Sequence, residues 1–127
     1  MKGINKFFHC TYCGNLAALI EDMGPSLVCC GEDMEALTAN SVDAAVEKHV
    51  PVASVLGDKL SVEVGSVAHP MTDDHYITFV YVGSESGGQR KALNPGMEPK
   101  ADFCFTNDKP LKVYAYCNLH GLWEADL

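Results

Sequence analysis

The chain has 127 residues, enough for one ordinary domain or for a small domain with a miniature one attached. Hydrophobic residues make up 47% of it, which predicts a packed core and argues against disorder. The formal net charge of −8 argues against binding to nucleic acid or to an anionic membrane, because both partners require a basic patch.

The N-terminal residues 1–8 contain neither the apolar core nor the small-residue cleavage site of a signal peptide. No stretch of the chain is long and apolar enough for a membrane-spanning helix. We therefore expect a cytoplasmic protein, in which six cysteines favour metal binding over disulfides. A secreted, disulfide-rich domain that has lost its signal peptide is the alternative.

Four cysteines occur near the N-terminus, as a CxxC pair and a later adjacent pair: Cys10, Cys13, Cys29 and Cys30. Four thiolates suit zinc or a single iron, and the sequence does not distinguish the two metals. We expect a short strand over residues 16–20, a turn at 23–25, and a solvated His9 that is not a ligand. The segment is too short to bury a sufficient core, so metal, pairing with a second copy, or both must stabilise it.

The rest of the chain predicts an all-β domain. Residues 36–40 look like the join, and residues 41–46 predict a helical turn capped by Asn40 or Ser41. We predict seven short strands, at residues 50–56, 59–64, 76–82, 90–93, 101–105, 111–116 and 122–125. With no long segment of helical periodicity, this pattern indicates a β-sandwich or barrel. Cys104 lies inside a predicted strand, where we expect it to pack as a small apolar side chain and not to bind metal.

A second group of possible ligands lies in this domain. Cys117 ends a predicted strand, and His120 follows three residues later, across a turn at Asn118. Thiolate with imidazole suits zinc, copper or iron. Three more histidines fall at strand ends and loops, not on apolar faces: His49, His69 and His75. We expect the four histidines and Cys117 to share one metal ion, the alternative being unrelated surface histidines.

Together, these motifs make the chain resemble desulfoferrodoxin, the two-domain form of superoxide reductase, over essentially its whole length. The resemblance is carried by Cys10-x2-Cys13-x15-Cys29-Cys30, Glu47-Lys48-His49-Val50-Pro51, His69-Pro70-Met71, His75-Tyr76-Ile77 and Cys117-Asn118-Leu119-His120-Gly121-Leu122-Trp123. It implies a desulforedoxin-like domain with an Fe(Cys)4 centre at residues 1–37. It also implies an immunoglobulin-like β-sandwich with an Fe(His)4(Cys) centre at residues 38–127.

The resemblance further implies the one-electron reduction of superoxide to hydrogen peroxide without release of dioxygen. In the family pattern the four imidazoles are equatorial and Cys117 is axial, which leaves one position free in the ferrous state. Hydrogen bonds from the amides of Leu119 and His120 to the sulfur are also suggested. Members of the family are homodimers, and their usual electron donor is rubredoxin.

Two charged residues beside His49 receive roles from the same resemblance. Lys48 places positive charge near the metal, which would steer an anionic substrate against the overall charge of −8. Glu47 corresponds to a carboxylate that can occupy the free position in the ferric state. Apart from the resemblance, Lys48 is one of nine basic residues on the surface.

Three alternative functions remain open from the residues alone. A cupredoxin-like electron carrier also uses a cysteine and a nearby histidine after a strand, but it needs a weak axial methionine that does not follow His120 here. A rubredoxin-like electron carrier would use only the four-cysteine centre. A binding module with two structural zincs would leave the second site with one ligand too many, because structural zinc is four-coordinate.

Overall fold

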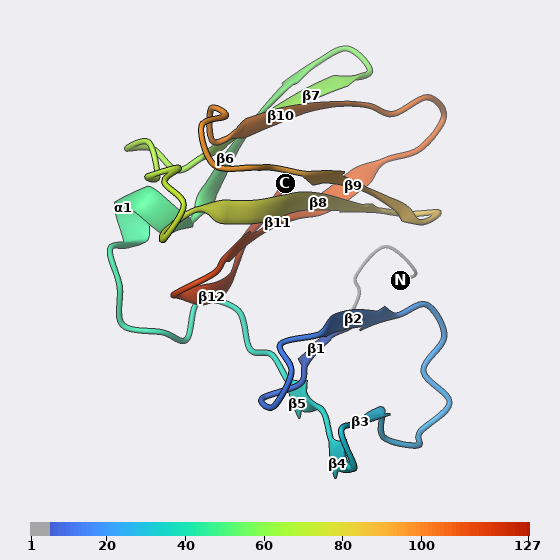
Figure 1. Ribbon diagram of the computed structural model, residues 1–127. Helices are drawn as coiled ribbons and strands as arrows, with labels where there is room; N and C mark the ends of the chain where they lie inside the picture. The colour runs from blue at the N-terminus through green and yellow to red at the C-terminus, as the bar shows by residue number, and fades with distance from the viewer. Residues whose placement is uncertain (1–5) are drawn as a thin grey trace. The chain divides into compact units, whose positions relative to one another are not determined.

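The structure is a computed structural model that describes residues 6–127. The described chain divides into two compact units, residues 6–38 and residues 39–127 (Figure 1). The predictions for the N-terminal segment and for the start of the first domain fall partly on residues 1–5, which lie outside the described residues.

The smaller unit is built from very short strands: β1 (Lys6–His9), β2 (Leu16–Leu19), β3 (Val28–Cys29), β4 (Glu32–Asp33) and β5 (Glu35–Ala36). Strand β1 is central in a three-stranded antiparallel sheet, with β2 and β5 on its two sides, and β3 pairs with β4. Strand β2 agrees with the predicted strand, whereas β1 is not predicted from the sequence. Among residues 6–38 only Phe7 and Cys10 are buried, so apolar packing contributes little here.

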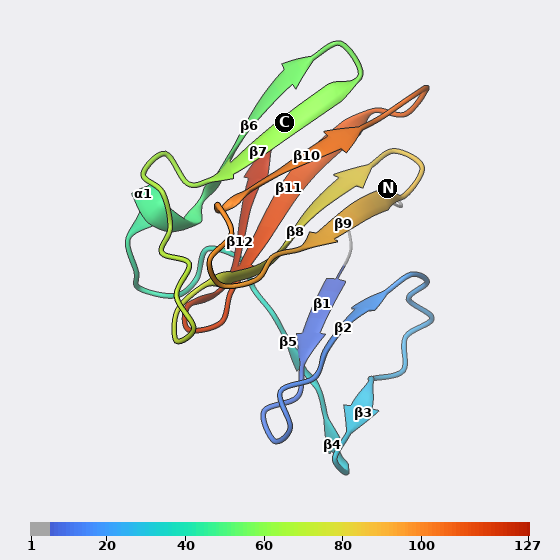
Figure 2. The same ribbon diagram turned by 45° about the horizontal axis from the view of Figure 1, so that its top comes forward.

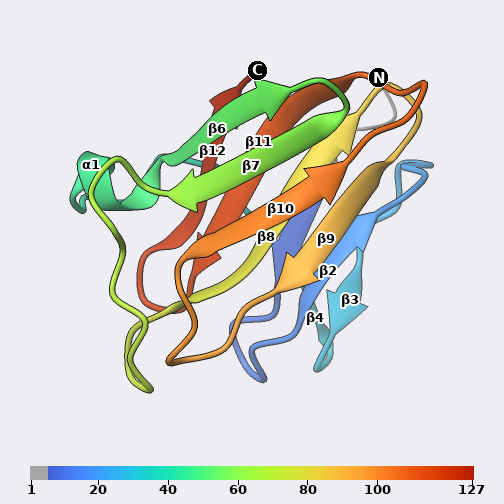
Figure 3. The ribbon, with the colours of Figure 1, turned by 90° about the horizontal axis from the view of Figure 1, so that it is seen from above.

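The larger unit is an immunoglobulin-like sandwich of two antiparallel sheets (Figures 2 and 3). One sheet has the order β10-β7-β6, and the other has the order β12-β11-β8-β9. The strands are β6 (Pro51–Leu56), β7 (Lys59–Val64), β8 (Ile77–Ser84), β9 (Gly88–Ala92), β10 (Lys100–Cys104), β11 (Pro110–Cys117) and β12 (Gly121–Asp126). All seven predicted strands are present, with ends that differ by two residues or fewer.

Alternation along the strands decides which side chains fill the space between the sheets. On β7, Leu60, Val62 and Val64 point inward and are almost fully buried. On β11 the inward positions are Val113, Ala115 and Cys117. Cys117 is thus the last core position of its strand, and its sulfur lies at the edge of the apolar core.

Two expectations for this unit are wrong. The only helix among residues 6–127 is α1 (Val46–His49), which begins where the helical turn over residues 41–46 was expected to end. Ala45 has an extended backbone, with ψ of 109°, so no helix forms before it. Cys104 is exposed because Ala101 and Phe103 take the inward positions of β10. No helix in the described part of the chain is long and apolar enough to cross a membrane.

Candidate metal centres

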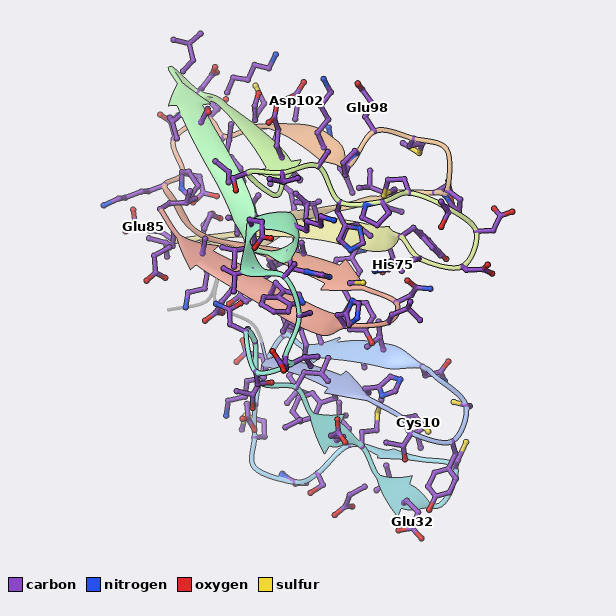
Figure 4. The ribbon with its side chains drawn as sticks, turned by 90° about the vertical axis from the view of Figure 1, so that its left-hand side faces the viewer. Cys10, Glu32, His75, Glu85, Glu98 and Asp102 are labelled. Carbon is purple, nitrogen blue, oxygen red and sulfur yellow. The ribbon has the colours of Figure 1, made fainter. Side chains whose placement is uncertain are left out.

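Four sulfur atoms meet in the smaller unit, around Cys10 (Figure 4). The Sγ atoms of Cys10, Cys13, Cys29 and Cys30 all lie within 4.8 Å of one another, and none is in a disulfide. The Cys13–Cys29 separation is 3.6 Å and the Cys29–Cys30 separation is 4.0 Å. Sulfurs that bind one tetrahedral ion at about 2.3 Å lie about 3.8 Å apart. The spacing therefore fits a single metal ion.

Tight backbone turns bring these sulfurs together. The amide of Gly14 donates to the carbonyl of Cys10 at 2.9 Å and closes the turn of the CxxC pair. At the second pair, Cys30 has φ of 55° and Gly31 has φ of 77°. Glycine adopts this left-handed conformation readily, whereas cysteine adopts it rarely. The strained position of Cys30 is thus the one that turns its sulfur toward the other three.

The protonation of the cluster also indicates a cation. The amide of Cys13 donates to the sulfur of Cys10 and lowers the pKa of Cys10 to about 6. A hydrogen bond between the sulfurs of Cys30 and Cys13 raises the pKa of Cys30 to about 12. A hydrogen bond between the sulfurs of Cys29 and Cys13 likewise raises the pKa of Cys29. Crowded sulfurs cannot all ionise on their own, so a metal ion is needed for four thiolates to coexist.

In the larger unit, two buried histidines are fixed by backbone hydrogen bonds. His49 ends helix α1, and its Nδ1 lies 2.7 Å from the carbonyl oxygen of Ala45. The Nδ1 of His69 lies 2.7 Å from the carbonyl oxygen of Pro70. Because a carbonyl only accepts, both Nδ1 atoms carry the proton and donate it. Each Nε2 is then an unprotonated nitrogen with its lone pair available to a metal.

The other ligand candidates come from two loops. His75 lies in the loop that leads into β8, and Cys117 and His120 flank the turn between β11 and β12. Ligand atoms of His49, His69, His75 and Cys117 all lie within 4.8 Å of one another. His120 is outside that set, but its Nδ1 is 3.1 Å from the Nε2 of His49 and 3.8 Å from the sulfur of Cys117.

The four imidazole rings form a square. Going around it, the ring centroids are 4.7 Å apart for His49–His69, 4.6 Å for His69–His75, 5.0 Å for His75–His120 and 4.9 Å for His120–His49. One diagonal, His49–His75, is 6.3 Å. Neighbouring rings are turned by 73° to 90° relative to one another. Figure 4 shows His75 at the end of the sandwich.

The nitrogens at the centre of the square are spaced as ligands of one cation would be. The Nε2 atoms of His49 and His69 are 3.2 Å apart, yet neither has a proton to donate to the other. Two nitrogens at right angles on one ion, each about 2.1 Å away, lie about 3.0 Å apart. The Nε2 of His75 is buried and has no hydrogen-bond partner among the described residues. A single ion in the square would give His75 Nε2 a partner and would suit the short separation between the Nε2 atoms of His49 and His69.

Burial favours the neutral form of three of these histidines. It lowers the pKa of His69 to about 4, and it is also the main cause of the lowered pKa values of His49 and His75. Burial raises the pKa of Cys117, and the amides of Leu119 and His120 oppose this rise by donating to its sulfur. Neutral imidazoles are the form that binds metal. The site thus offers unprotonated nitrogens without competition from protons.

Lys48 and Glu47 lie on α1, directly before His49, and both are exposed. After burial and the neighbouring histidines, the positive charge of Lys48 is a further cause of the lowered pKa of His75. Glu47 is held through its backbone, where its carbonyl accepts a hydrogen bond from the amide of Val67 at 2.8 Å. The Lys48 charge therefore acts on the square of rings, and the Glu47 side chain stands beside it in solvent.

Other contributors to the site were not assigned a role from the sequence. Trp123 is 1% exposed, its ring lies 4.8 Å from that of His49, and its Nε1 donates to the carbonyl of His120 at 3.1 Å. Gly65 packs against the backbone of α1 so closely that a Cβ would come within 2.7 Å of the Glu47 carbonyl oxygen. The position of Trp123 shortly after Cys117 and His120 could have indicated from the sequence that it packs at the site. Nothing in the sequence around Gly65 indicates its role.

The fold and the two sites define a class: a β-sandwich protein with a square of histidines and a buried cysteine sulfur beside it, joined to a miniature unit with a four-sulfur metal site. The description of the desulfoferrodoxin family matches residues 41–126, and that of the desulfoferrodoxin N-terminal domain matches residues 4–37. The chain belongs to the desulfoferrodoxin family. Two iron centres per chain follow, the four-cysteine centre and the histidine–cysteine centre.

Known relatives are similar over nearly the full length. A desulfoferrodoxin homolog from Archaeoglobus fulgidus is 42% identical over 125 residues, covering 98% of this chain and 99% of the relative. A desulfoferrodoxin from Syntrophotalea carbinolica is 44% identical over 119 residues and covers 94% of both chains. The crystal structure of the superoxide reductase from Treponema pallidum matches with a TM-score of 0.81 and 40% identity, covering 96% of this chain and 98% of the other.

Proposed function

We propose that the protein is a superoxide reductase that converts superoxide to hydrogen peroxide at the histidine–cysteine centre. The observation that carries this function is the square of four imidazoles with the buried sulfur of Cys117 beside it. A ferrous ion held by these residues would supply one electron, and superoxide would take up that electron and two protons from water to leave as hydrogen peroxide. The Treponema pallidum relative is itself named a superoxide reductase.

Lys48 is proposed to attract the substrate. Superoxide is an anion, and the chain carries a formal charge of −8, so the surface as a whole repels it. Lys48 is exposed and acts electrostatically on His49 and His75, which makes it a local source of attraction at the site. Local fields of this kind raise association rates by about 10-fold to 1,000-fold.

Glu47 is proposed to close the free face of the site between turnovers. Its carboxylate is exposed and one residue away from Lys48, while its backbone is held by Val67. A side chain that is anchored at its backbone but free at its carboxylate is able to move toward the metal face and away from it. Removing this carboxylate should leave superoxide capture fast and change only the optical spectrum of the ferric protein.

The sulfur of Cys117 needs moderation for this chemistry. Strong donation from a thiolate favours cleavage of an O–O bond, whereas a reductase must release peroxide intact. The amides of Leu119 and His120 donate to the sulfur and withdraw part of its charge. We assign these two amides the role of keeping the sulfur from donating too strongly.

The remaining properties are proposed from the family and the exposed surface. We propose that residues 1–37 and 38–127 are separate domains, and that the protein is a cytoplasmic homodimer that receives electrons from a rubredoxin-type donor. The six cysteines are free of disulfides, as a reducing compartment requires. Ile20 and Met23 are 89% and 84% exposed, and a second copy would cover such side chains.

The test is the reaction of the ferrous protein with superoxide. The full chain, loaded anaerobically with iron, should lose the ferrous form of its histidine–cysteine centre when superoxide is generated by pulse radiolysis. One hydrogen peroxide should form per superoxide, without dioxygen. Oxidation of the four-cysteine centre alone would instead make the protein an electron carrier, and dioxygen release would indicate dismutation.

A further inference from the structure

Asn118 lies on the turn between two ligand candidates, Cys117 and His120, but its side chain points to a different part of the site. Its Nδ2 donates to the carbonyl of Asp74 at 3.0 Å, and its Oδ1 accepts from the amide of Tyr76 at 2.9 Å. Its backbone amide also donates to the carbonyl of Tyr76, at 3.2 Å. Asn118 therefore holds the residues on both sides of His75.

His75 differs from the other histidines in how its ring is held. The Nδ1 atoms of His49 and His69 are fixed by carbonyl oxygens at 2.7 Å. The His75 ring makes no such hydrogen bond to any of residues 6–127, and its Nε2 has no partner. Apart from the packing of its ring against those of His69 and His120, the position of His75 therefore depends on its backbone.

That backbone is a small loop with little support of its own. The amide of His75 donates to the carbonyl of Thr72 at 3.2 Å, and its carbonyl accepts from the Thr72 amide at 3.0 Å. These bonds close the loop on itself but do not attach it to the sandwich. The three hydrogen bonds between Asn118 and residues Asp74 and Tyr76 attach the loop to the turn that carries Cys117 and His120.

We propose that Asn118 is the positioning residue of the metal centre, which sets the place of His75 relative to Cys117 and His120. Asn118 thereby links three of the five ligands. It lies in the chain between Cys117 and His120, and it is hydrogen-bonded to the residues on either side of His75. The proposal rests on the proposed function only in taking these five residues as metal ligands. Groups that orient a ligand from outside typically change metal affinity by 10-fold to 100-fold when removed.

The chain contains a matched control. Asn40 brackets Glu124 in the same way, with its Nδ2 donating to the Glu124 carbonyl at 3.1 Å and its Oδ1 accepting from the Glu124 amide at 2.8 Å. Asn40→Ala removes the same two kinds of hydrogen bond from the same unit without touching a ligand loop. Asn40 has φ of 58°, so its replacement by Ala also adds backbone strain. A loss of Co2+ affinity that is confined to Asn118→Ala therefore does not come from lost stability alone.

The experiment is a titration of the metal-free full chain with Co2+, followed by the fluorescence of Trp123. Trp123 is the only tryptophan, and its ring is 4.8 Å from that of His49, so the signal reports on this centre. Asn118→Ala should weaken Co2+ binding by about 10-fold to 100-fold, and Asn40→Ala should change it less than about 2-fold. The four-cysteine residues are unchanged in every variant, so their contribution cancels.

A double-mutant cycle decides whether Asn118 acts through His75. In a His75→Ala background, adding Asn118→Ala should weaken Co2+ binding less than about 2-fold further, because the residue it positions is gone. Wild-type affinity in Asn118→Ala would overturn the proposal, as would losses that simply multiply in the double variant. Neither the Co2+ titration nor the double-mutant cycle uses superoxide. A failed reductase assay would therefore not decide whether this inference is correct.

Discussion

The two metal centres of this protein are built in opposite ways. The four-cysteine centre lies in a unit of strands two to four residues long, where only Phe7 and Cys10 of residues 6–38 are buried. The histidine–cysteine centre lies at the end of a sandwich whose core includes Cys117 itself. In the small unit the metal must therefore stabilise the fold. In the sandwich the packed core positions the ligands without help from the metal.

This difference shows in the ligands themselves. Cys13 and Cys30 are exposed residues, and their sulfurs depend on tight turns for their position. His49 and His69 are each 2% exposed, and each is oriented by a backbone carbonyl. The exposed cysteine cluster of the small unit suits a centre that has only to retain its metal ion. A preorganised, buried cluster suits one that must hold its geometry while a substrate enters and leaves.

The largest expected effect comes from removing metal from the four-cysteine centre. Cys13→Ser should abolish hydrogen-exchange protection across residues 6–38, because structural metal sites in miniature domains contribute about 10–16 kcal/mol to folding. The sandwich should keep its protection. Hydrogen exchange read by mass spectrometry measures both units at once, and Cys104→Ser, which alters an exposed cysteine of β10, is the control. Retained protection of the small unit in Cys13→Ser would show that metal is not what holds it.

A smaller effect is expected where the sandwich supports α1. In Gly65→Ala the new Cβ would meet the carbonyl oxygens of Glu47 and Val50 at 2.7 Å and 2.8 Å, so the helix must shift. We expect the free energy of unfolding to fall by about 1–3 kcal/mol and Co2+ affinity to fall with it. Urea denaturation and the Trp123 titration measure the two effects. Gly87→Ala, at a position with open space around it, should do neither.

Removing the charge of Lys48 should change the reaction rate and not the fold. Lys48→Ala is expected to slow superoxide capture by about 10-fold and to reduce its dependence on salt, because one attractive charge near the site is lost. Pulse radiolysis at several ionic strengths measures both. Glu47→Ala, one residue away, is the matched control and should not slow capture. An unchanged rate in Lys48→Ala would remove this residue from the mechanism.

The smallest effect is expected at Ser84, where β8 ends. Its hydroxyl donates to the carboxylate of Asp108 at 2.6 Å and, with the amide of Ser86, lowers the Asp108 pKa below its ordinary 3.8. A lowered carboxyl pKa stabilises the fold above the unfolded-state value, and this contribution is lost as the pH falls through the folded-state value. Ser84→Ala should thus lower Tm by a few degrees at about pH 7 and by less at about pH 2.5. Equal losses at both pH values would show that the ionised carboxylate is not involved.

Strand patterns and ligand spacing made much of this molecule predictable from its sequence. Alternating residues place all seven strands of the sandwich, because each strand has one face against the core. The position of α1 was not predictable, since an extended Ala45 delays the helix and a loop at Gly65 supports it. The same is true of Asn118, whose contacts join segments far apart in the sequence. Such contacts leave no periodic pattern.

The central claim is that four imidazoles and one sulfur surround a single iron. Diffraction at the iron absorption edge, from crystals of the chain loaded with ferrous iron, tests it directly. We predict one anomalous peak within the sandwich unit, bounded by the Nε2 atoms of His49, His69 and His75, the Nδ1 of His120 and the sulfur of Cys117. No peak at that place, or a Cys117 sulfur bonded to another sulfur, would contradict the account.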